Sequence, residues 1–132
     1  MKEGYFENEF AEMWIEDGIV YQVYKKNLVI TLTIAKKLVE DRLVLSHGVT
    51  RPIFIDIRNL VSIDRISMKY YKTREVFVHI NAAAFHIDNY FSKFIADIFL
   101  NFAKPLIPTK MFTDKKKALK WLENYKIAVS EF

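Results

Sequence analysis

Three histidines and several aspartates are the side chains of this sequence that could exchange protons with a substrate. Acid–base catalysis needs such groups within hydrogen-bond reach of each other. The chain has no cysteine nucleophile, no Ser/His/Asp order and no His-x-x-x-His spacing for a metal ion. We therefore expect no enzyme activity, no metal and no cofactor. The residues weighed for acid–base roles are His47, His79, His86, Asp56, Asp64 and Asp88.

The spacing of these groups favours structural roles. His86 and Asp88 are two residues apart and would share a strand face, a spacing that often arises by chance. We expect Asp56 to accept hydrogen bonds from the backbone or from Arg58, because a nearly buried carboxylate must offset its desolvation. His47 precedes a glycine at an expected helix end, so we interpret it as a neighbour of the helix cap.

Anion binding is a second chemistry to weigh. With three glycines in all, the chain has no phosphate-binding loop. Lys115, Lys116 and Lys117 open the last expected helix, and a helix N-terminus with three lysines could bind an anion. A solvated run of charges is the favoured alternative. Nucleic-acid binding is not expected, because Trp121 and Tyr125 belong to the core-facing stripe of that helix.

Composition indicates one soluble domain spanning residues 1–132, with 52% hydrophobic residues. The absence of cysteine suits a reducing cytoplasm, and no apolar run is long enough to span a bilayer. The two ends of the chain carry opposite charge, since residues 1–20 are acidic and residues 104–132 are rich in lysine. This asymmetry could draw the ends together or present a basic patch, although two solvated faces are the favoured interpretation.

Residues 52–57, Pro-Ile-Phe-Ile-Asp-Ile, predict a central strand, because an almost unbroken apolar run suits a strand covered on both faces. A hairpin over residues 10–24 turns at Asp17-Gly18, and a helix follows from a Thr31 cap to His47-Gly48. Three further segments are expected to be helices: residues 66–78 capped by Asp64, residues 90–103, and the segment after Thr113 or Asp114. Strands are expected over residues 81–88 and 108–112.

The order ββαβαβαβα predicts an α/β fold. Its mixed sheet would hold the N-terminal hairpin followed by three βα units, with parallel later strands and right-handed crossovers.

Two segments resemble the STAS family, the domain of anti-sigma-factor antagonists and sulfate-transporter tails. Residues 53–64, Ile-Phe-Ile-Asp-Ile-Arg-Asn-Leu-Val-Ser-Ile-Asp, are similar to its central strand, loop and helix start. Residues 109–114 and 118–122 are similar to its closing strand and helix. With the hairpin at residues 14–19, the chain looks most like small stand-alone bacterial STAS-like proteins of uncharacterised function. The resemblance implies a regulatory or protein-interaction module.

The motif departs from the family where phosphorylation would occur. Family members that act as switches carry serine or threonine and then glycine after the second aspartate, which here is Asp64. This sequence has Arg65, Ile66 and Ser67 there, and Ser62 precedes the aspartate. Neither serine takes over the switch position, so a phosphorylation switch is not expected. The positions equivalent to the motif are Asp56, Ser62, Asp64 and Ser67.

The helix expected over residues 90–103 is apolar around most of its circumference. One stripe faces the core, formed by Phe91, Phe94, Ile95, Ile98 and Phe102. Four further apolar residues extend the arc: Ala96, Phe99, Leu100 and Ala103. A second copy of the chain, a neighbouring helix or a ligand should cover this surplus face, and a two-fold homodimer is favoured.

We therefore expect a non-enzymatic STAS-like module that regulates or binds another protein. The alternative is a carrier that encloses a small apolar or lipid-like ligand between the sheet and the helices. The two differ in where apolar surface lies, because an interaction module shows it outside and a carrier encloses it.

Overall fold

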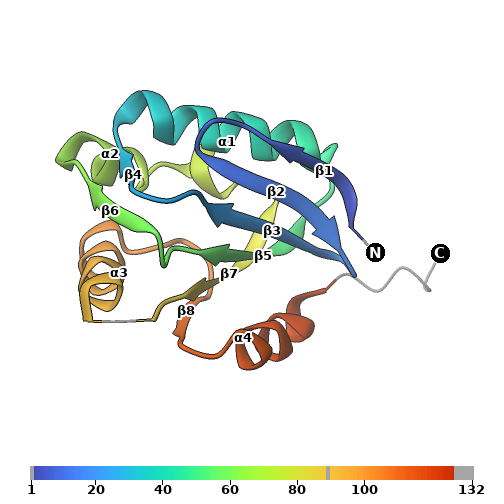
Figure 1. Ribbon diagram of the computed structural model, residues 1–132. Helices are drawn as coiled ribbons and strands as arrows, with labels where there is room; N and C mark the ends of the chain where they lie inside the picture. Colours follow the sequence, from blue (N-terminus) through green and yellow to red (C-terminus); the bar gives the residue numbers. More distant parts are fainter. Residues whose placement is uncertain (1, 89, 127–132) are drawn as a thin grey trace.

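The computed structural model describes residues 2–88 and 90–126 and has an α/β architecture (Figure 1). A six-stranded sheet has the order β1-β2-β3-β5-β7-β8, and a small second sheet pairs β4 with β6. The strands are β1 (Glu3–Glu7), β2 (Ala11–Glu16), β3 (Ile19–Tyr24), β4 (Leu28–Ile30), β5 (Arg51–Asp56), β6 (Leu60–Ile63), β7 (Ile80–His86) and β8 (Thr109–Phe112). The helices are α1 (Leu32–Ser46), α2 (Arg65–Tyr70), α3 (Tyr90–Ala103) and α4 (Lys115–Leu122), with 3₁₀ turns η1 (Arg74–Phe77) and η2 (Glu123–Tyr125).

The predicted sheet is confirmed. Strands β1, β2 and β3 pair antiparallel, whereas β3, β5, β7 and β8 pair parallel. The strand expected to be central, β5, lies between β3 and β7. Because α1 connects β3 to β5 and α3 connects β7 to β8, the later strands form the expected βα units.

The predicted hairpin turn lies between β2 and β3. Asp17 has a φ of 52° and Gly18 a φ of 77°, the positive values that a type I′ turn requires at both central positions. Lys126 Nζ lies 2.8 Å from Asp17 Oδ2, so the end of the described chain contacts this turn. Within residues 2–88 and 90–126, this ion pair joins the acidic start of the chain to its lysine-rich end.

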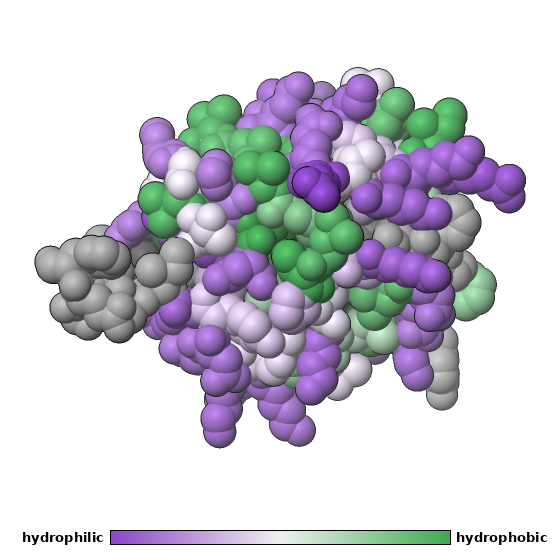
Figure 2. Space-filling model, turned by 180° about the vertical axis from the view of Figure 1, so that it is seen from behind, coloured by the Kyte–Doolittle hydropathy of each residue, from purple (hydrophilic) through white to green (hydrophobic). Residues whose placement is uncertain are grey.

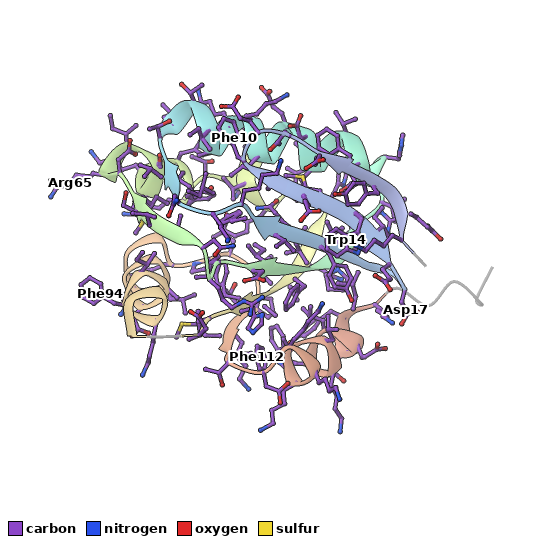
Figure 3. The ribbon with its side chains drawn as sticks, in the orientation of Figure 1. Phe10, Trp14, Asp17, Arg65, Phe94 and Phe112 are labelled. Carbon is purple, nitrogen blue, oxygen red and sulfur yellow. The ribbon has the colours of Figure 1, made fainter. Side chains whose placement is uncertain are left out.

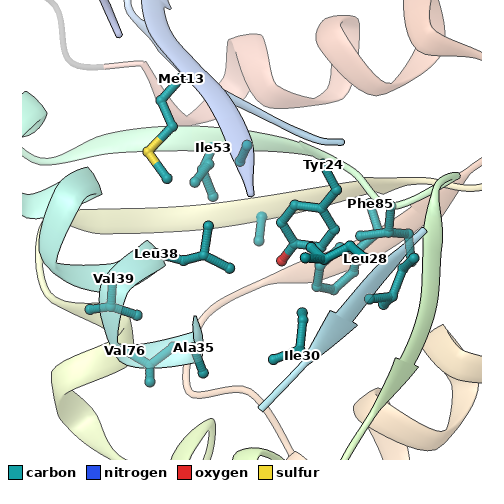
Figure 4. Close-up of a cluster of buried hydrophobic side chains, with 14 of the residues drawn as sticks. Met13, Tyr24, Leu28, Ile30, Ala35, Leu38, Val39, Ile53, Val76 and Phe85 are labelled. Carbon is teal, nitrogen blue, oxygen red and sulfur yellow. The ribbon is translucent and has the colours of Figure 1, made fainter. Parts of the chain in front are cut away.

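The sheet carries two unequal layers. Alternate strand residues face opposite sides, so Ile53 and Ala83 pack in the cluster shared with α1 and α3, whereas Phe54 and Ala84 pack in the cluster shared with α4. Figure 1 shows α1 and α4 on opposite sides of the sheet. Figure 4 shows the larger cluster, in which Leu38 of α1 lies among side chains of the sheet.

Small residues let α4 approach the sheet closely. Ala82 and Ala84 of β7 are fully buried in one cluster with Ala118 and Leu122 of α4. Three consecutive alanines are unexpected in a strand, because alanine has a weak preference for strands. For Ala82 and Ala84 the reason is the close approach of α4 on this face of the sheet.

Both ends of α1 match the predicted signals, with one change. Thr31 Oγ1 accepts a hydrogen bond from the Ile34 N–H at 3.5 Å, as a helix N-cap does. His47 itself is the left-handed C-cap, with a φ of 49°, and Gly48 continues with a φ of 75°. The left-handed backbone expected at the glycine therefore begins one residue earlier.

Three parts of the fold differ from the sequence-based expectation. Strand β1 was not predicted because it contains a glycine and two glutamates, which are uncommon in strands, and the β4–β6 sheet was not predicted because β4 has three residues. The helix expected over residues 66–78 is divided into α2 and η1. The Thr73 hydroxyl donates to the Tyr70 carbonyl at 2.7 Å, so a side chain takes up a carbonyl at the point where α2 ends.

Across the part of the chain that the structure describes, every helix is too short or too polar to cross a membrane.

Candidate functional site

A cavity lies between the α1-covered face of the sheet and the elements that cover it. It has a volume of about 90 Å³ and is partly open to solvent. A single water needs roughly 10–15 Å³ of such space. Apolar side chains form most of the wall, among them Leu38, Val39, Ile53, Ile57, Ala83 and Phe85.

The sequence places small and polar residues where larger apolar ones would fill this space. Ala83 lies in the middle of β7, where its neighbours Ile80 and Phe85 also line the cavity. Gln22 and Tyr24 of β3 line it too, and Gln22 Nε2 donates to the Tyr24 hydroxyl at 3.3 Å. The cavity is therefore apolar with a few polar groups, as binding sites for small molecules generally are.

Arg42 of α1 also lines the cavity and is 3% exposed. Its Nη1 donates to the Val78 carbonyl and its Nη2 to the Val76 carbonyl, each at 2.8 Å. Burial lowers the pKa of this guanidinium to about 10, against a smaller opposing effect of Tyr70 and Tyr71. Arg42 therefore stays protonated at neutral pH.

Sequence reasoning gave an enclosed ligand between the sheet and the helices as the alternative function, but it predicted neither the residues that line the cavity nor a role for Arg42. The apolar residues Ala35, Leu38, Val39 and Leu45 form the buried face of α1, and Arg42 is buried among them. The available signal was spacing, because residue 42 follows residues 38 and 39 by four and three positions and so shares their face.

A second polar group lies where β5 and β7 end. Asp56 is 7% exposed and accepts three hydrogen bonds from Arg58: from its backbone N–H at 3.1 Å, from Nε at 2.9 Å and from Nη2 at 2.8 Å. The predicted role of Asp56 is thus confirmed. Burial raises the pKa of Asp56, but the hydrogen bonds and charge of Arg58 outweigh that effect and hold it below its usual value.

His86 is the histidine nearest to this carboxylate. Its Nδ1 lies 4.0 Å from Asp56 Oδ2, beyond hydrogen-bond distance, and has no hydrogen-bond partner within residues 2–88 and 90–126. Burial lowers the pKa of His86, which leaves the imidazole neutral at pH 7. Because Arg58 occupies both oxygens of Asp56, the pair is not arranged to move a proton.

The remaining acid–base candidates are dispersed. His47 is exposed at the end of α1, and His79 precedes β7 with a φ of 63°. Asp64 caps α2, and Asp88 follows β7. Among the residues described, no three His, Cys, Asp or Glu side chains are grouped to hold a metal ion.

The motif positions of the α2 start lie together but differ in access. Asp64 Oδ1 accepts from the Ser67 backbone N–H at 2.8 Å, as predicted for a cap. Ser67 is fully buried, so a kinase could not reach it in this fold, whereas Ser62 is exposed on β6. Arg65 points away from the molecule (Figure 3).

The three lysines of α4 do not converge on one point. Lys115 Nζ lies 5.7 Å from the ring centroids of both Tyr21 and Phe54, within cation–π range. Lys116 and Lys117 are exposed on the first turn, and the Lys116 N–H already donates to the carboxylate of Asp114 at 2.8 Å. Anion binding here stays a prediction.

Helix α3 faces the sheet differently from the expectation. Ala96 is 1% exposed and Leu100 packs against the core, so the chain itself covers these two expected interface residues. Phe94, expected in the core, is 62% exposed and points outward (Figure 3). Apolar residues surround most of α3, so the sequence pattern could not determine which face of the helix packs on the sheet. The side chains of five further residues of this prediction lie outside the described part of the structure: Phe91, Ile98, Phe99, Phe102 and Ala103.

The surface carries further exposed apolar side chains. Ile66 of α2 is 60% exposed and Leu106 is 61% exposed. On the face turned away from the viewer of Figure 1, apolar atoms gather near the middle and are framed by hydrophilic side chains (Figure 2).

Comparison with known proteins identifies both family and fold. A family model described as a domain of unknown function, DUF7793, matches residues 13–126. An uncharacterised protein of the DUF3478 family from Shewanella loihica PV-4, whose crystal structure has a SpoIIAA-like fold, superposes with a TM-score of 0.58. The two sequences are 15% identical, and the alignment covers 92% of this chain and 95% of the other. No curated protein matches the sequence. The expected STAS-like fold is confirmed.

Proposed function

We propose that this chain, which belongs to the DUF7793 family, is a non-catalytic binding module that holds a small apolar molecule in the cavity beneath α1. The observation that carries this proposal is the cavity itself. Protein interiors are packed as densely as organic crystals, and voids larger than a water molecule are few. A space of this size in the core of a 132-residue domain is therefore better explained by an occupant than by the demands of the fold.

The polar groups elsewhere support a role in binding over one in catalysis. Arg58 engages Asp56 through both of its oxygens, and His86 is too far from that carboxylate to exchange a proton with it. A chain without cysteine suits the reducing cytoplasm, where we place this module.

The test uses a neutral probe and a variant that fills the cavity. We expect 1-decanol, added below its solubility limit, to bind the protein and to raise its melting temperature in proportion to occupancy. Ala83→Leu adds three carbon atoms to the wall and should weaken decanol binding at least about tenfold, measured by isothermal titration calorimetry. It should leave stability unchanged or raised, because the added atoms enter empty space.

A matched control is Val44→Leu, which changes an exposed residue of the same covering helix, 72% exposed. This variant should bind decanol as the unmodified protein does. If the unmodified protein does not bind decanol, or if Ala83→Leu binds it equally well, the cavity is not the binding site.

A second candidate function is interaction with a protein, including a second copy of the chain. It is favoured by the exposed side chains of Phe94 on α3 and Ile66 on α2, since these two helices contact each other. Exposed apolar side chains on adjoining elements are typical of interaction surfaces. This candidate places apolar surface outside, whereas the first encloses it, and the two functions are compatible in one molecule.

A further inference from the structure

Arg42 is the one charged residue among those described that line the cavity. Helix α1 directs it inward from the same face as Leu38 and Val39, although an arginine on an apolar stripe normally extends its charged end into water. Here 97% of the residue is shielded, because it is 3% exposed. The position of a permanent cation beside an apolar cavity therefore needs an explanation.

The protein supplies dipoles to this cation but no opposite charge. Two of the five N–H donors of the guanidinium are used by the carbonyl groups of Val76 and Val78. Within residues 2–88 and 90–126, no carboxylate lies within 4.0 Å of Arg42. Buried charges in proteins are generally paired, because an isolated ion loses its hydration without compensation. Asp56 shows the usual solution in this same chain, since it has Arg58 as its partner.

We infer that the missing counter-ion is part of the ligand, so that the cavity takes a monoanionic amphiphile whose carboxylate pairs with Arg42 and whose hydrocarbon chain lies along the apolar wall. A carboxylate suits the site for two reasons. One guanidinium balances a single negative charge, and its planar fork presents two parallel donors to two oxygens. This inference rests on the proposed function and names the class of its ligand.

The polar neighbours of Arg42 fit the same chemistry. Gln22, Tyr24 and Tyr71 line the cavity together with Arg42. A hydroxyl group can donate to a carboxylate oxygen that lies beside the guanidinium. No acidic side chain lines the cavity in the described part of the chain, so nothing there repels an anion.

The experiment compares three ligands that differ only in the head group. Decanoate, 1-decanol and decylamine are titrated into the unmodified protein by calorimetry at pH 8, all below their micelle concentrations. We expect decanoate to bind at least about tenfold more tightly than decanol, because an ion pair with two carboxylate oxygens replaces a hydrogen bond from the guanidinium to one neutral oxygen. Decylamine, a cation, should bind more weakly than either.

The variant Arg42→Gln then tests the residue. It keeps a hydrogen-bond donor for the carbonyl groups but removes the charge, so the preference for decanoate over decanol should disappear while decanol still binds. Arg51→Gln is the matched control, because Arg51 also donates to a carbonyl group of α1, that of Ser46 at 3.3 Å, but does not line the cavity. It should keep the preference.

The outcomes separate this inference from the proposed function. If decanol and decanoate bind the unmodified protein equally well, Arg42 serves only to fasten η1 to α1 and the inference is wrong, while the proposed function stands. If neither binds, both are wrong. If Arg42→Gln fails to fold, as judged by near-ultraviolet circular dichroism, the three-ligand comparison on the unmodified protein decides alone.

Discussion

Replacing Arg58 with methionine should destabilise the protein in a way that depends on pH. The substitution removes two side-chain hydrogen bonds to Asp56, from Nε and Nη2, and leaves the bond from the backbone N–H. A hydrogen bond to a buried charged group contributes about 1.5–3 kcal/mol. The Arg58 side chain is 45% exposed, so water can replace part of what is lost. We therefore expect a loss of about 2 kcal/mol in the free energy of unfolding at pH 7.

The sign of the pH dependence follows from the pKa of Asp56. In the unmodified protein that pKa is lowered, so Asp56 contributes stability that is present above its unfolded pKa, about 3.9, and is lost as the pH falls through the folded value. In the variant the effect of burial is opposed by the backbone N–H and the smaller effect of His86, without the Arg58 side chain, which should raise the folded pKa above that of the unfolded chain. Asp56 then destabilises the variant at neutral pH, and this penalty disappears as the pH falls and the carboxyl group binds a proton.

The difference between the two proteins should thus be largest near pH 7 and should shrink as the pH falls, because the variant carboxyl group binds a proton first; it should vanish below the lowered folded pKa of Asp56, where the carboxyl group is protonated in both proteins. Urea denaturation at several pH values measures it. Lys25→Met is the control, because it breaks an exposed ion pair with Glu7 and should change stability by less than about 1 kcal/mol. A difference that stays constant between pH 3.5 and pH 7 would show that Arg58 acts by packing and does not neutralise Asp56.

Two further substitutions examine the two faces of the molecule. Ala84→Leu should lower the free energy of unfolding by about 1–3 kcal/mol in urea denaturation, because Ala84 is fully buried against α4. The same change at Ala83 places the added atoms in the cavity and should not lower stability. Equal effects at the two positions would refute this assignment of faces. If a second copy of the chain packs on α3, static light scattering should find the unmodified protein dimeric at high micromolar concentration and Phe94→Glu monomeric with unchanged far-ultraviolet dichroism. Val44→Glu, on the exposed side of α1, should remain dimeric, and a monomeric unmodified protein rules out this interface.

Local chemistry made much of the fold predictable from the sequence. The turn at Asp17 and Gly18 needs positive φ at both positions, which few residue pairs tolerate, so its location was clear. Thr31, Asp64 and Asp114 cap helices through hydrogen bonds to residues two or three positions away, which also leaves a sequence signature.

The rotation of helices could not be predicted in the same way. Helix α3 is apolar on most sides, so periodicity could not determine that Ala96 faces the core and Phe94 faces solvent. The cavity depends on which residues of many separate elements, among them α1, α3 and most strands of the sheet, face one another across the core, and Arg42 became a candidate once those elements were assembled. The interaction of Asp56 with Arg58 was foreseeable because it spans two residues.

The outermost strands of the sheet limit how this protein can associate with itself. An exposed strand edge offers unpaired backbone groups to other chains and favours aggregation unless something interrupts it. Strand β1 carries Glu3 and Glu7, and its pairing with β2 is broken by a register shift beside Gly4, whose φ is 61°. At the other margin β8 has four residues, with Pro108 before it and Lys110 exposed. Both margins of the six-stranded sheet therefore disfavour the addition of a further strand from a second chain.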